Sequence, residues 1–520
     1  MSPTPAMQSG TGSVQEKGLG NLAAHGRPAV SAAGIFDAIR RIEARACLDG
    51  ADWMAGDLPL WPLYRMELYR AMFAHQTDAA RASTRPGGLA ARLRPAFARN
   101  RRVSATVPGA LWLVSDGISF TRSGAVELEK FCAPLWHACQ ALGRQATVVD
   151  RGSVTPRASL EPMDWQMPQT ARAKLMGLVG AALRPDARHG RLVARLRQVA
   201  DDLRIELPPL SPRRFDAMTR AVLRLAHAHH RRMLREKPAA VMLVCWYDVG
   251  GYAYVLAAAR AGIAVMDLQH GVTGRYHAGY SGWDHLPPSV LRLLPTHFWT
   301  WSAADAAVID GWGASTGRRA LCGGHPLMQA WAAGLVPLGD AMQVRMDRLL
   351  ADSRGRVRVL VTLQPGLLSA DALGPFIDAC RMAPDVAWWL RLHPMAFADA
   401  PVVEKLMRES QVLHWNIADA SDLPLPALLA ASDVHATHSS SAVIEAAALG
   451  VPSVVWSAYG GELFKDTTQA GLLCVAAQPE PFVRALVARP SVTARASSGG
   501  AAESMPQLRR TLATFLESLE

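Results

Sequence analysis

Short apolar runs alternate with segments of helical periodicity along most of this chain, and they do so in two separate series. Apolar runs bounded by turn residues are typical of buried strands, and longer stretches with a period near 3.6 are typical of helices. Because strand–helix–strand alternation produces parallel sheets with helices on both faces, each series predicts one doubly wound α/β domain. We therefore expect two Rossmann-like domains that face a cleft, preceded by a helical extension.

The first series contains six predicted strands: 110–114, 146–149, 240–245, 264–268, one just before Trp301, and 320–323. The second contains five: 357–363, 386–390, 412–415, 434–437 and 453–456. We divide the chain into a disordered lead (1–34), a basic helical extension (35–105), an N-terminal domain (106–335, with an insertion at about 151–212), a C-terminal domain (336–487), and a linker with a terminal helix (488–520).

Charge limits the classes of partner. The formal net charge is +11 and the pI about 9.6, which favours anionic lipid, phosphorylated substrates or nucleic acid, although a solvated basic face is an equally good interpretation. Aromatic residues are not interleaved with the arginines as a stacking platform requires, so we expect no nucleic-acid partner. No apolar run is long enough to span a bilayer and no secretory signal opens the chain, which predicts a cytoplasmic protein, with peripheral contact to the anionic inner membrane as an option.

Ligands of open parallel sheets bind beyond the carboxyl ends of the strands, and polar clusters follow several predicted strands. Ser439, Ser440 and Ser441 follow the strand that ends at Thr437 and open a predicted helix at 440–449. Their hydroxyl groups and the free N–H groups of the helix start suit a phosphate, and Glu445, one turn later, suits ribose hydroxyls. Simple capping of the helix by serine is the alternative interpretation.

A second cluster follows the run 386–390. Arg391 offers a planar double donor for phosphate, His393 a donor that titrates near neutral pH, and Pro394 a fixed loop conformation. Gln364 and Gly366 follow the first strand of the same domain, where a glycine loop lets backbone approach a phosphate and where a plain turn is the alternative.

In the N-terminal domain, polar and aromatic residues follow the strand at 264–268. Gln269, His270 and Gly271, with Tyr276 and His277 behind them, form a candidate site for an acceptor or a sugar. The alternative interpretation is a hydrogen-bonded loop packed between the domains.

Asp116 follows the first predicted strand, where a carboxylate could act as the general base, although Asp-Gly is also a common turn. We therefore predict Asp116, His270 and His393 as the catalytic residues. There is no credible Asp-x-Asp and no His/Cys cluster with ligand spacing, so we expect neither a metal nor a cofactor. The departing phosphate would then depend on Arg391, His393 and the serines.

The motif at 391–394 together with Ser439, Ser440 and Ser441 resembles the His-Pro and Ser-Ser motifs of bacterial polysialyltransferases and related sialyltransferases, of capsule Kdo transferases and of CDP-glycerol glycerophosphotransferases. Those families have the GT-B fold and cytidine-nucleotide donors. The sialyltransferases also carry an acidic-acidic-Gly motif with the general base, and Ser115-Asp116-Gly117 has only one of its two acidic residues.

This resemblance implies a metal-independent glycosyltransferase that moves a sugar of the Kdo or sialic-acid class from a nucleotide donor to a glycan or glycolipid acceptor of capsule or lipopolysaccharide. Two alternatives stay open. The first is an isomerase of the UDP-sugar 2-epimerase type, which shares the architecture, and the second is a non-catalytic nucleotide-binding protein of the same fold.

Overall fold

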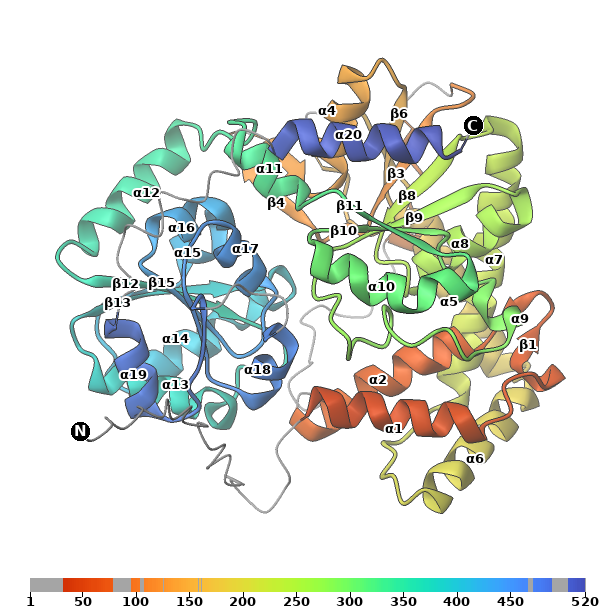
Figure 1. Cartoon of the computed structure of the whole chain (residues 1–520), viewed down its shortest axis with the longest axis horizontal. Coiled ribbons are helices and arrows are strands. Elements are labelled where there is room, and N and C mark those ends of the chain that lie inside the picture. Colours follow the sequence, from red (N-terminus) through yellow and green to blue (C-terminus); the bar gives the residue numbers. More distant parts are fainter. Residues whose placement is uncertain are drawn as a thin grey trace, which may run out of the picture.

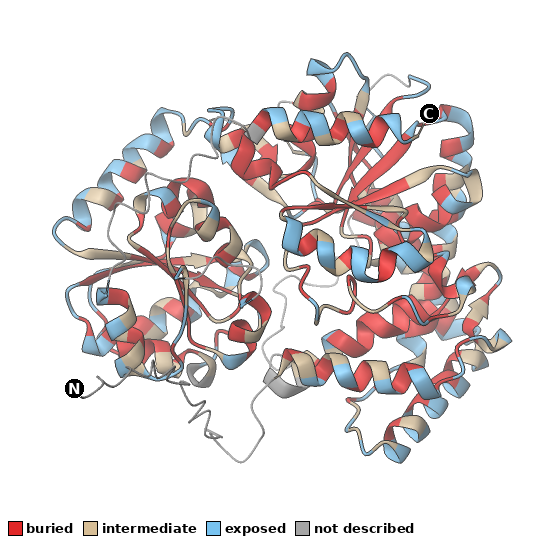
Figure 2. Ribbon diagram, viewed as in Figure 1, coloured by how far each residue is buried: buried red, intermediate tan, exposed pale blue. Residues whose placement is uncertain are grey.

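The computed structural model describes residues 31–77, 95–102, 107–124, 126–157, 159, 161–465, 471–488 and 504–519. These residues form two lobes, each built around a parallel sheet with helices on both faces (Figure 1). Apolar strands occupy the middle of each lobe, and the exposed sides of the helices face outward (Figure 2). The predicted fold class, two doubly wound α/β domains of the GT-B type, is confirmed.

The N-terminal sheet has seven parallel strands in the order β11-β10-β9-β8-β3-β6-β7. Its strands are β3 (Leu111–Ser115), β6 (Ala146–Asp150), β7 (Met163–Trp165), β8 (Ala240–Val244), β9 (Ala264–Leu268), β10 (His297–Thr300) and β11 (Arg319–Cys322). The two central strands, β3 and β8, are buried along their whole length, as strands covered on both faces must be.

The C-terminal sheet has six parallel strands in the order β14-β13-β12-β15-β16-β17. They are β12 (Val357–Leu363), β13 (Val386–Leu392), β14 (Trp415–Asn416), β15 (Val434–Thr437), β16 (Ser453–Val455) and β17 (Leu473–Val475). Two small antiparallel hairpins complete the strands: β1 (Met54–Ala55) with β2 (Leu58–Pro59), and β4 (Phe120–Ser123) with β5 (Val126–Glu129).

The helices of the N-terminal lobe are α1 (Ala32–Arg45), α2 (Trp61–Thr77), α4 (Cys132–Ala141), α5 (Met167–Leu183), α6 (Ala187–Asp202), α7 (Pro212–Glu236), α8 (Val249–Ala261), α9 (Pro288–Leu291), α10 (Ala303–Thr316), α11 (Pro326–Ala332) and α20 (Ser504–Glu517). Those of the C-terminal lobe are α12 (Asp340–Asp352), α13 (Ala370–Met382), α14 (Ala400–Glu409), α15 (Ala418–Asp422), α16 (Leu425–Ala431), α17 (Ala442–Ala448), α18 (Ala458–Phe464) and α19 (Pro479–Val487).

Most predicted strands lie where the apolar runs placed them, and the differences fall in polar segments. The sequence of residues 124–142 has a helical pattern that predicts one helix, but its start is a strand: β5 belongs to a hairpin and α4 begins only at Cys132. The insertion at 151–212 supplies the edge strand β7 as well as α5 and α6. The edge strands β7 and β17 have only three residues each, which is too short for a strand pattern to be recognised in the sequence.

Segments near both ends of the described chain pack on the N-terminal lobe, although the start of α1 also contacts α18 of the C-terminal lobe. Residues of α2 and its hairpin, among them Trp53, Trp61 and Tyr64, share one core with α6, α7 and α8. At the other end, α20 lies across α4, α11 and β11 (Figure 1). Most of the lead predicted at 1–34, the segment 78–94 of the basic extension and the linker at 489–503 lie outside the described residues.

The strand order of each sheet indicates where a ligand would bind. In the N-terminal sheet the chain leaves β3 toward β6 on one side and later returns to β8 on the other, and in the C-terminal sheet β12 has β13 and β15 as its two neighbours. These are the topological switch points at which doubly wound sheets bind ligands. Within the described part of the chain, no helix is both long and apolar enough to cross a membrane.

Candidate functional site

The loops that follow β12 and β15 meet at the switch point of the C-terminal sheet. Gln364, just after β12, accepts hydrogen bonds through its Oε1 from the backbone N of Ser439 (3.1 Å) and from the Ser439 hydroxyl (3.0 Å). Ser440 N donates to Thr437 Oγ1 at 3.2 Å. These bonds hold the serine loop against the end of the sheet and fix the direction in which Ser440 and Ser441 face.

A pocket between the lobes lies directly over this switch point. Its polar and charged lining comes from both domains: Ser119, Lys130, His270, Thr362, Gln364, Arg391, His393, Ser440, Ser441 and Glu445. Pro394 also lines the pocket. Eight of the predicted site residues line it, so the structure brings the Arg-Leu-His-Pro turn and the serine loop to one place. What these residues bind stays a prediction.

His393 follows β13, and its side chain caps the short 3-10 helix at Pro394–Asp399. Its Nδ1 accepts a hydrogen bond from Met395 N at 3.2 Å. Burial, together with the charges of Lys130 and Arg391, lowers the pKa of His393 to about 4, against the opposing effect of Asp116. The imidazole is therefore neutral near pH 7, and because Nδ1 is an acceptor, the ring proton lies on Nε2.

Arg391 also lines the pocket, but part of its guanidinium forms hydrogen bonds with backbone carbonyl oxygens. Nη1 donates to the carbonyl oxygens of Ala420 (2.9 Å) and Leu423. Burial lowers the pKa of Arg391 to about 10, so the side chain stays positive at neutral pH. Nη1 of Arg391 is thus held by backbone carbonyl oxygens. We expect the guanidinium to donate to a phosphate through its remaining N–H groups.

Lys130 is a pocket residue that the sequence analysis did not identify. It directly follows β5, and its backbone N donates to Ser119 O at 2.9 Å, which closes the β4–β5 hairpin. Burial lowers the pKa of Lys130, Arg391 lowers it further, and the carboxylates of Glu445, Asp116 and Glu129 oppose both. This hairpin places a cation of the N-terminal domain in the same pocket as Arg391 and His393.

The helix behind the serines is shorter than predicted. α17 spans Ala442–Ala448, and Ser441 precedes it without a side-chain capping bond. The hydroxyl of Ser440 accepts from Ala442 N at 3.3 Å. Ser439 does not line the pocket, because its hydroxyl is bound to Gln364 and to His438 Nδ1. Of the three serines, Ser440 and Ser441 therefore line the pocket.

Glu445 contacts the other domain. Its Oε1 lies 3.4 Å from Nε2 of His325, which packs on Trp301 with 4.0 Å between the ring centroids. Burial raises the pKa of Glu445, but the hydrogen bond and charge of His325, with Lys130 and Arg391, outweigh it and lower the pKa overall. The ionised carboxylate thus joins the lobes beside the pocket, which leaves its predicted contact with ribose hydroxyls untested.

On the N-terminal side, His270 follows β9 and borders the pocket. Its Nδ1 lies 3.2 Å from Leu268 O and 3.4 Å from the Tyr280 hydroxyl, and its Nε2 lies 3.1 Å from the Tyr247 hydroxyl. An Nδ1–H that donates to the carbonyl leaves Nε2 unprotonated. Burial lowers the pKa of His270, which keeps the ring neutral and able to accept a proton.

Asp116 follows β3 but does not itself line the pocket. Its Oδ1 accepts from the backbone N of Ile118 and of Ser119 (both 3.0 Å), and its Oδ2 accepts from the Ser119 hydroxyl (3.0 Å). The carboxylate therefore shapes the turn that presents Ser119 to the pocket, which is the alternative interpretation of the Ser-Asp-Gly motif.

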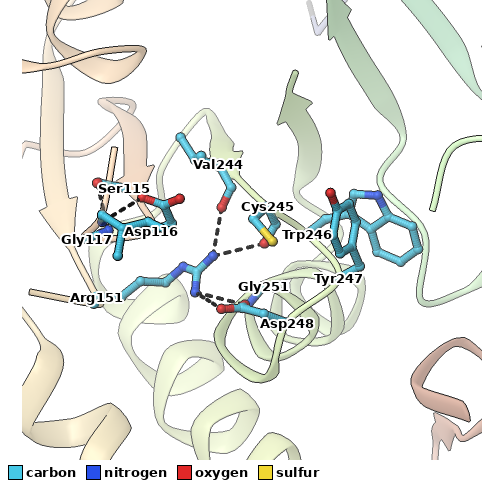
Figure 3. Close-up of polar contacts among 12 residues, drawn as sticks. Ser115, Asp116, Gly117, Arg151, Val244, Cys245, Trp246, Tyr247, Asp248 and Gly251 are labelled. Carbon is cyan, nitrogen blue, oxygen red and sulfur yellow. Dashed lines mark hydrogen bonds and ion pairs between the residues drawn. The ribbon is translucent and has the colours of Figure 1, made fainter. Parts of the chain in front are cut away.

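Near this turn, the buried Arg151 joins the ends of β6 and β8 (Figure 3). Nη1 of Arg151 donates to both carboxylate oxygens of Asp248 (2.8 and 2.7 Å), and Nη2 donates to the carbonyl oxygens of Val244 (2.7 Å) and Cys245 (2.9 Å). Asp248 in turn caps α8 by accepting from Gly251 N at 2.6 Å. No sequence motif marks this pair, because its members lie 97 residues apart.

Several predicted site residues lie outside the pocket. Gln269 is buried and bonds to Gly271 O (3.0 Å) and Trp301 N (2.7 Å), so it joins strand ends instead of facing a sugar. His277 belongs to an aromatic cluster with Tyr69, Tyr247 and Tyr280, where burial lowers its pKa to about 3.

Two further predicted residues are also displaced from the pocket. Tyr276 lines a different pocket, beside α10 and α18. Gly366 has φ +80° in the turn after Gln364, so the plain-turn interpretation applies to it. Among the described residues, no group of three or more His, Cys, Asp or Glu side chains is arranged to hold a metal ion.

Solved structures with a similar two-lobe fold share little sequence with this chain. UDP-GlcNAc 2-epimerase from Neisseria meningitidis, bound to UDP-GlcNAc, is 14% identical over 78% of this chain and 99% of that chain, with a TM-score of 0.46. The epimerase of Methanocaldococcus jannaschii is 11% identical over 78% and 99%, with a TM-score of 0.46. An Anabaena protein in complex with UDP and glucose is 13% identical over 79% and 100%, with a TM-score of 0.42. No protein-family model and no curated protein matches the chain.

These comparisons contradict the predicted activity. The similar structures are mainly UDP-GlcNAc 2-epimerases, whereas the sequence analysis predicted a glycosyltransferase with a cytidine-nucleotide donor. The physical reason for the error is that Arg391, His393 and the serines are suited to a phosphate, and a phosphate is common to the substrates of both reactions. Nothing in those residues selects the base, the acceptor or the reaction.

Proposed function

We propose that this chain binds a nucleoside-diphosphate sugar in the cleft pocket and inverts the carbon next to the anomeric carbon, as an isomerase of the 2-epimerase type. One observation carries the proposal: Lys130 and His270 of the N-terminal domain line the same pocket as Arg391, His393 and the serine loop of the C-terminal domain. Donors for a diphosphate thus share a pocket with a proton-accepting imidazole.

The diphosphate side of the pocket suits a departing phosphate. Lys130 and Arg391 supply positive charge, His393 supplies a neutral Nε2–H donor, and the hydroxyls of Ser440 and Ser441 add two more donors. Donors fixed in place before the reaction stabilise charge that develops in the transition state without a reorganisation cost. In the proposed reaction that charge appears on the diphosphate as the bond from the anomeric carbon to oxygen breaks.

His270, from the N-terminal domain, is the proposed base that removes the proton from the sugar carbon. His270 takes the proton from the carbon next to the anomeric centre, the C–H bonding pair forms a double bond to the anomeric carbon, and the bonding pair of the anomeric C–O bond leaves with the diphosphate. A diphosphate oxygen then adds back to the anomeric carbon, a solvent proton adds to the opposite face of the neighbouring carbon, and His270 releases its proton to solvent. No co-substrate is consumed, so one pocket that holds one molecule is sufficient for the whole reaction.

Solvent exchange tests the chemistry. The full chain is incubated with UDP-GlcNAc in D2O, and the proton on carbon 2 of the sugar is followed by NMR. We expect loss of that signal together with appearance of the 2-epimer. His270→Gln should slow both by at least about a hundredfold, the usual contribution of a general base. Lys405→Met, an exposed lysine of α14, serves as the matched control for Lys130→Met.

Binding is measured separately by thermal shift with UDP, CDP, GDP and CMP, because a ligand that binds only the folded chain raises its stability. Lys130→Met should weaken nucleotide binding and Lys405→Met should not. Nucleotide binding without any deuterium exchange from a panel of nucleotide sugars would overturn the isomerase and favour the non-catalytic alternative. Absence of nucleotide binding would overturn the pocket assignment as well.

A further inference from the structure

The helix α5 buries its small residues and exposes its large apolar ones. Ala173, Gly177 and Ala181 face α7, and a Cβ added to Gly177 would lie 2.4 Å from the carbonyl oxygen of Ala217. The two backbones therefore touch, and no larger side chain fits between them. The exposed apolar side chains lie within eight residues: Met176 (46% exposed), Leu178 (61%), Val179 (39%) and Leu183 (76%).

This pattern is the reverse of an ordinary surface helix, which turns its apolar stripe toward the core. A contiguous apolar patch on a surface marks a docking site more often than a defect. Beside the patch, Leu178, Ala182, Met218 and Val249 line an apolar groove between α5 and α7, and the rim of the groove carries Lys174, Arg213 and Arg214.

The face around the patch is basic. A row of residues spaced three or four apart runs the length of α7: Arg214, Ala217, Ala221, Arg224, Ala228, Arg231 and Arg235. Its four arginines are exposed. The sequence of α5 contains no Asp or Glu. The two acidic residues of α7, Asp216 and Glu236, are buried in ion pairs with Arg220 and Arg232.

At the far end of this row, a second pocket is lined by Arg102, Arg231, Arg232 and Arg235, with Gln169 from the first turn of α5. Asp164 and Glu236 pair with Arg102 and Arg232, which leaves an excess of positive charge. The Arg232 side chain is 9% exposed, and among the described residues its buried Nη1 has no hydrogen-bond partner. Such a pocket suits a phosphate group.

We propose that the α5–α7 face, defined by these exposed apolar side chains, the arginine row and the arginine pocket, docks onto an anionic phospholipid membrane. Apolar side chains enter the boundary between headgroups and acyl chains while arginines bind headgroup phosphates. A second copy of this chain would fit the α5–α7 face less well, because a two-fold interface would place the arginine rows of two α7 helices against each other. This inference does not depend on the proposed isomerase activity.

Vesicle co-sedimentation of the full chain tests the proposal. We expect binding to vesicles with equal parts of phosphatidylglycerol and phosphatidylcholine, and little to phosphatidylcholine alone. The variants are Leu178→Glu with Leu183→Glu, and Arg231→Glu with Arg235→Glu. Each pair should weaken binding at least tenfold. A cation near the surface contributes about fivefold, which applies to the arginine pair, and the leucine pair replaces inserted apolar side chains by negative charges. Val344→Glu with Val402→Glu changes two equally exposed valines on α12 and α14 and should leave binding unchanged.

Thermal unfolding establishes that the variants fold, which is expected because all substituted side chains are exposed. Binding that falls as salt rises supports the arginine contribution, since surface charge is screened. Equal binding to neutral and anionic vesicles, or no binding to either, would overturn the proposal. Concentration-dependent dimers in light scattering that Leu178→Glu with Leu183→Glu abolishes would also overturn it, in favour of a second copy.

Discussion

At the scale of the residue, the environment of a side chain decides its chemistry more than its type does. Sequence reasoning took His393 as a group that titrates near neutral pH, but burial beside Lys130 and Arg391 keeps it neutral there and fixes its proton on Nε2. Glu445 is buried too, yet the cations around it hold it ionised. Both outcomes depend on neighbours from other segments of the chain.

His393 gives a testable pH dependence. A bound phosphate favours the protonated ring and so raises its pKa from about 4 in the free protein. A pKa that rises on binding strengthens binding below the bound-state value, by up to about tenfold per pH unit, and the gain saturates below about 4. We therefore expect UDP to bind more tightly as pH falls from about 8 to about 5.5.

The measurement is isothermal titration calorimetry in two buffers of different ionisation enthalpy. Protonation of the nucleotide itself affects every variant alike, so the comparison with His393→Gln isolates the ring. The wild-type chain should take up protons on binding and the variant should take up fewer. An identical pH dependence in both chains would show that His393 does not face the phosphate.

Lys130 and His325 show why some residues of the site escaped sequence analysis. Lys130 lies in a hairpin that the sequence suggests is helical, and His325 caps α11 beyond the last strand of its domain. Neither belongs to a motif. A polar residue directly after a predicted hairpin strand is the one signal that could have indicated Lys130, had β4 and β5 been recognised.

At the scale of the element, the loops after β3 and β6 are held by two glycines. Gly117 has φ +84°, and a Cβ added to Gly152 would lie 1.7 Å from the carbonyl oxygen of Asp116. The two loops therefore touch backbone to backbone. This contact fixes the position of the turn after β3, from which Ser119 lines the pocket.

We expect Gly152→Ala to destabilise the chain by more than about 2 kcal/mol, because neither backbone can withdraw without breaking the turn. Urea unfolding measures the change. Gly190→Ala is the matched control: its added Cβ would meet nothing within 4 Å inside α6, and we expect a gain of about 0.5–1 kcal/mol. If Gly152→Ala proved as stable as the wild-type chain, the close approach of the loops would be wrong.

At the scale of the whole molecule, the end of the chain returns to its first domain. The buried residues Leu508, Leu512 and Phe515 of α20 share a core with β3, α4 and β8 of the N-terminal lobe. The chain therefore passes through the C-terminal domain and closes on the N-terminal one. Hydrogen bonds such as Tyr69 to Tyr459 (3.2 Å) also join the lobes near the cleft.

Leu512→Ala should cost about 2–5 kcal/mol, as buried leucine truncations do, whereas Thr514→Ala on the exposed side of α20 should change stability by less than about 0.5 kcal/mol. Hydrogen exchange identifies the domain affected. Faster exchange in α4 and β11 with unchanged β12 and β15 is expected. Faster exchange in the C-terminal sheet instead would contradict the assignment of α20 to the N-terminal lobe.

The sequence by itself determined the two parallel sheets and the central strands, because buried strands must be apolar and their spacing by helices is a local property. It also indicated the serine loop and the Arg-Leu-His-Pro turn, since both directly follow such strands. The tertiary structure alone decided that Lys130 lines the pocket, that His325 contacts Glu445 beside it, that Asp116 shapes a turn, and that the large apolar residues of α5 face outward. These outcomes depend on contacts between distant segments, and neither composition nor periodicity encodes which segments meet.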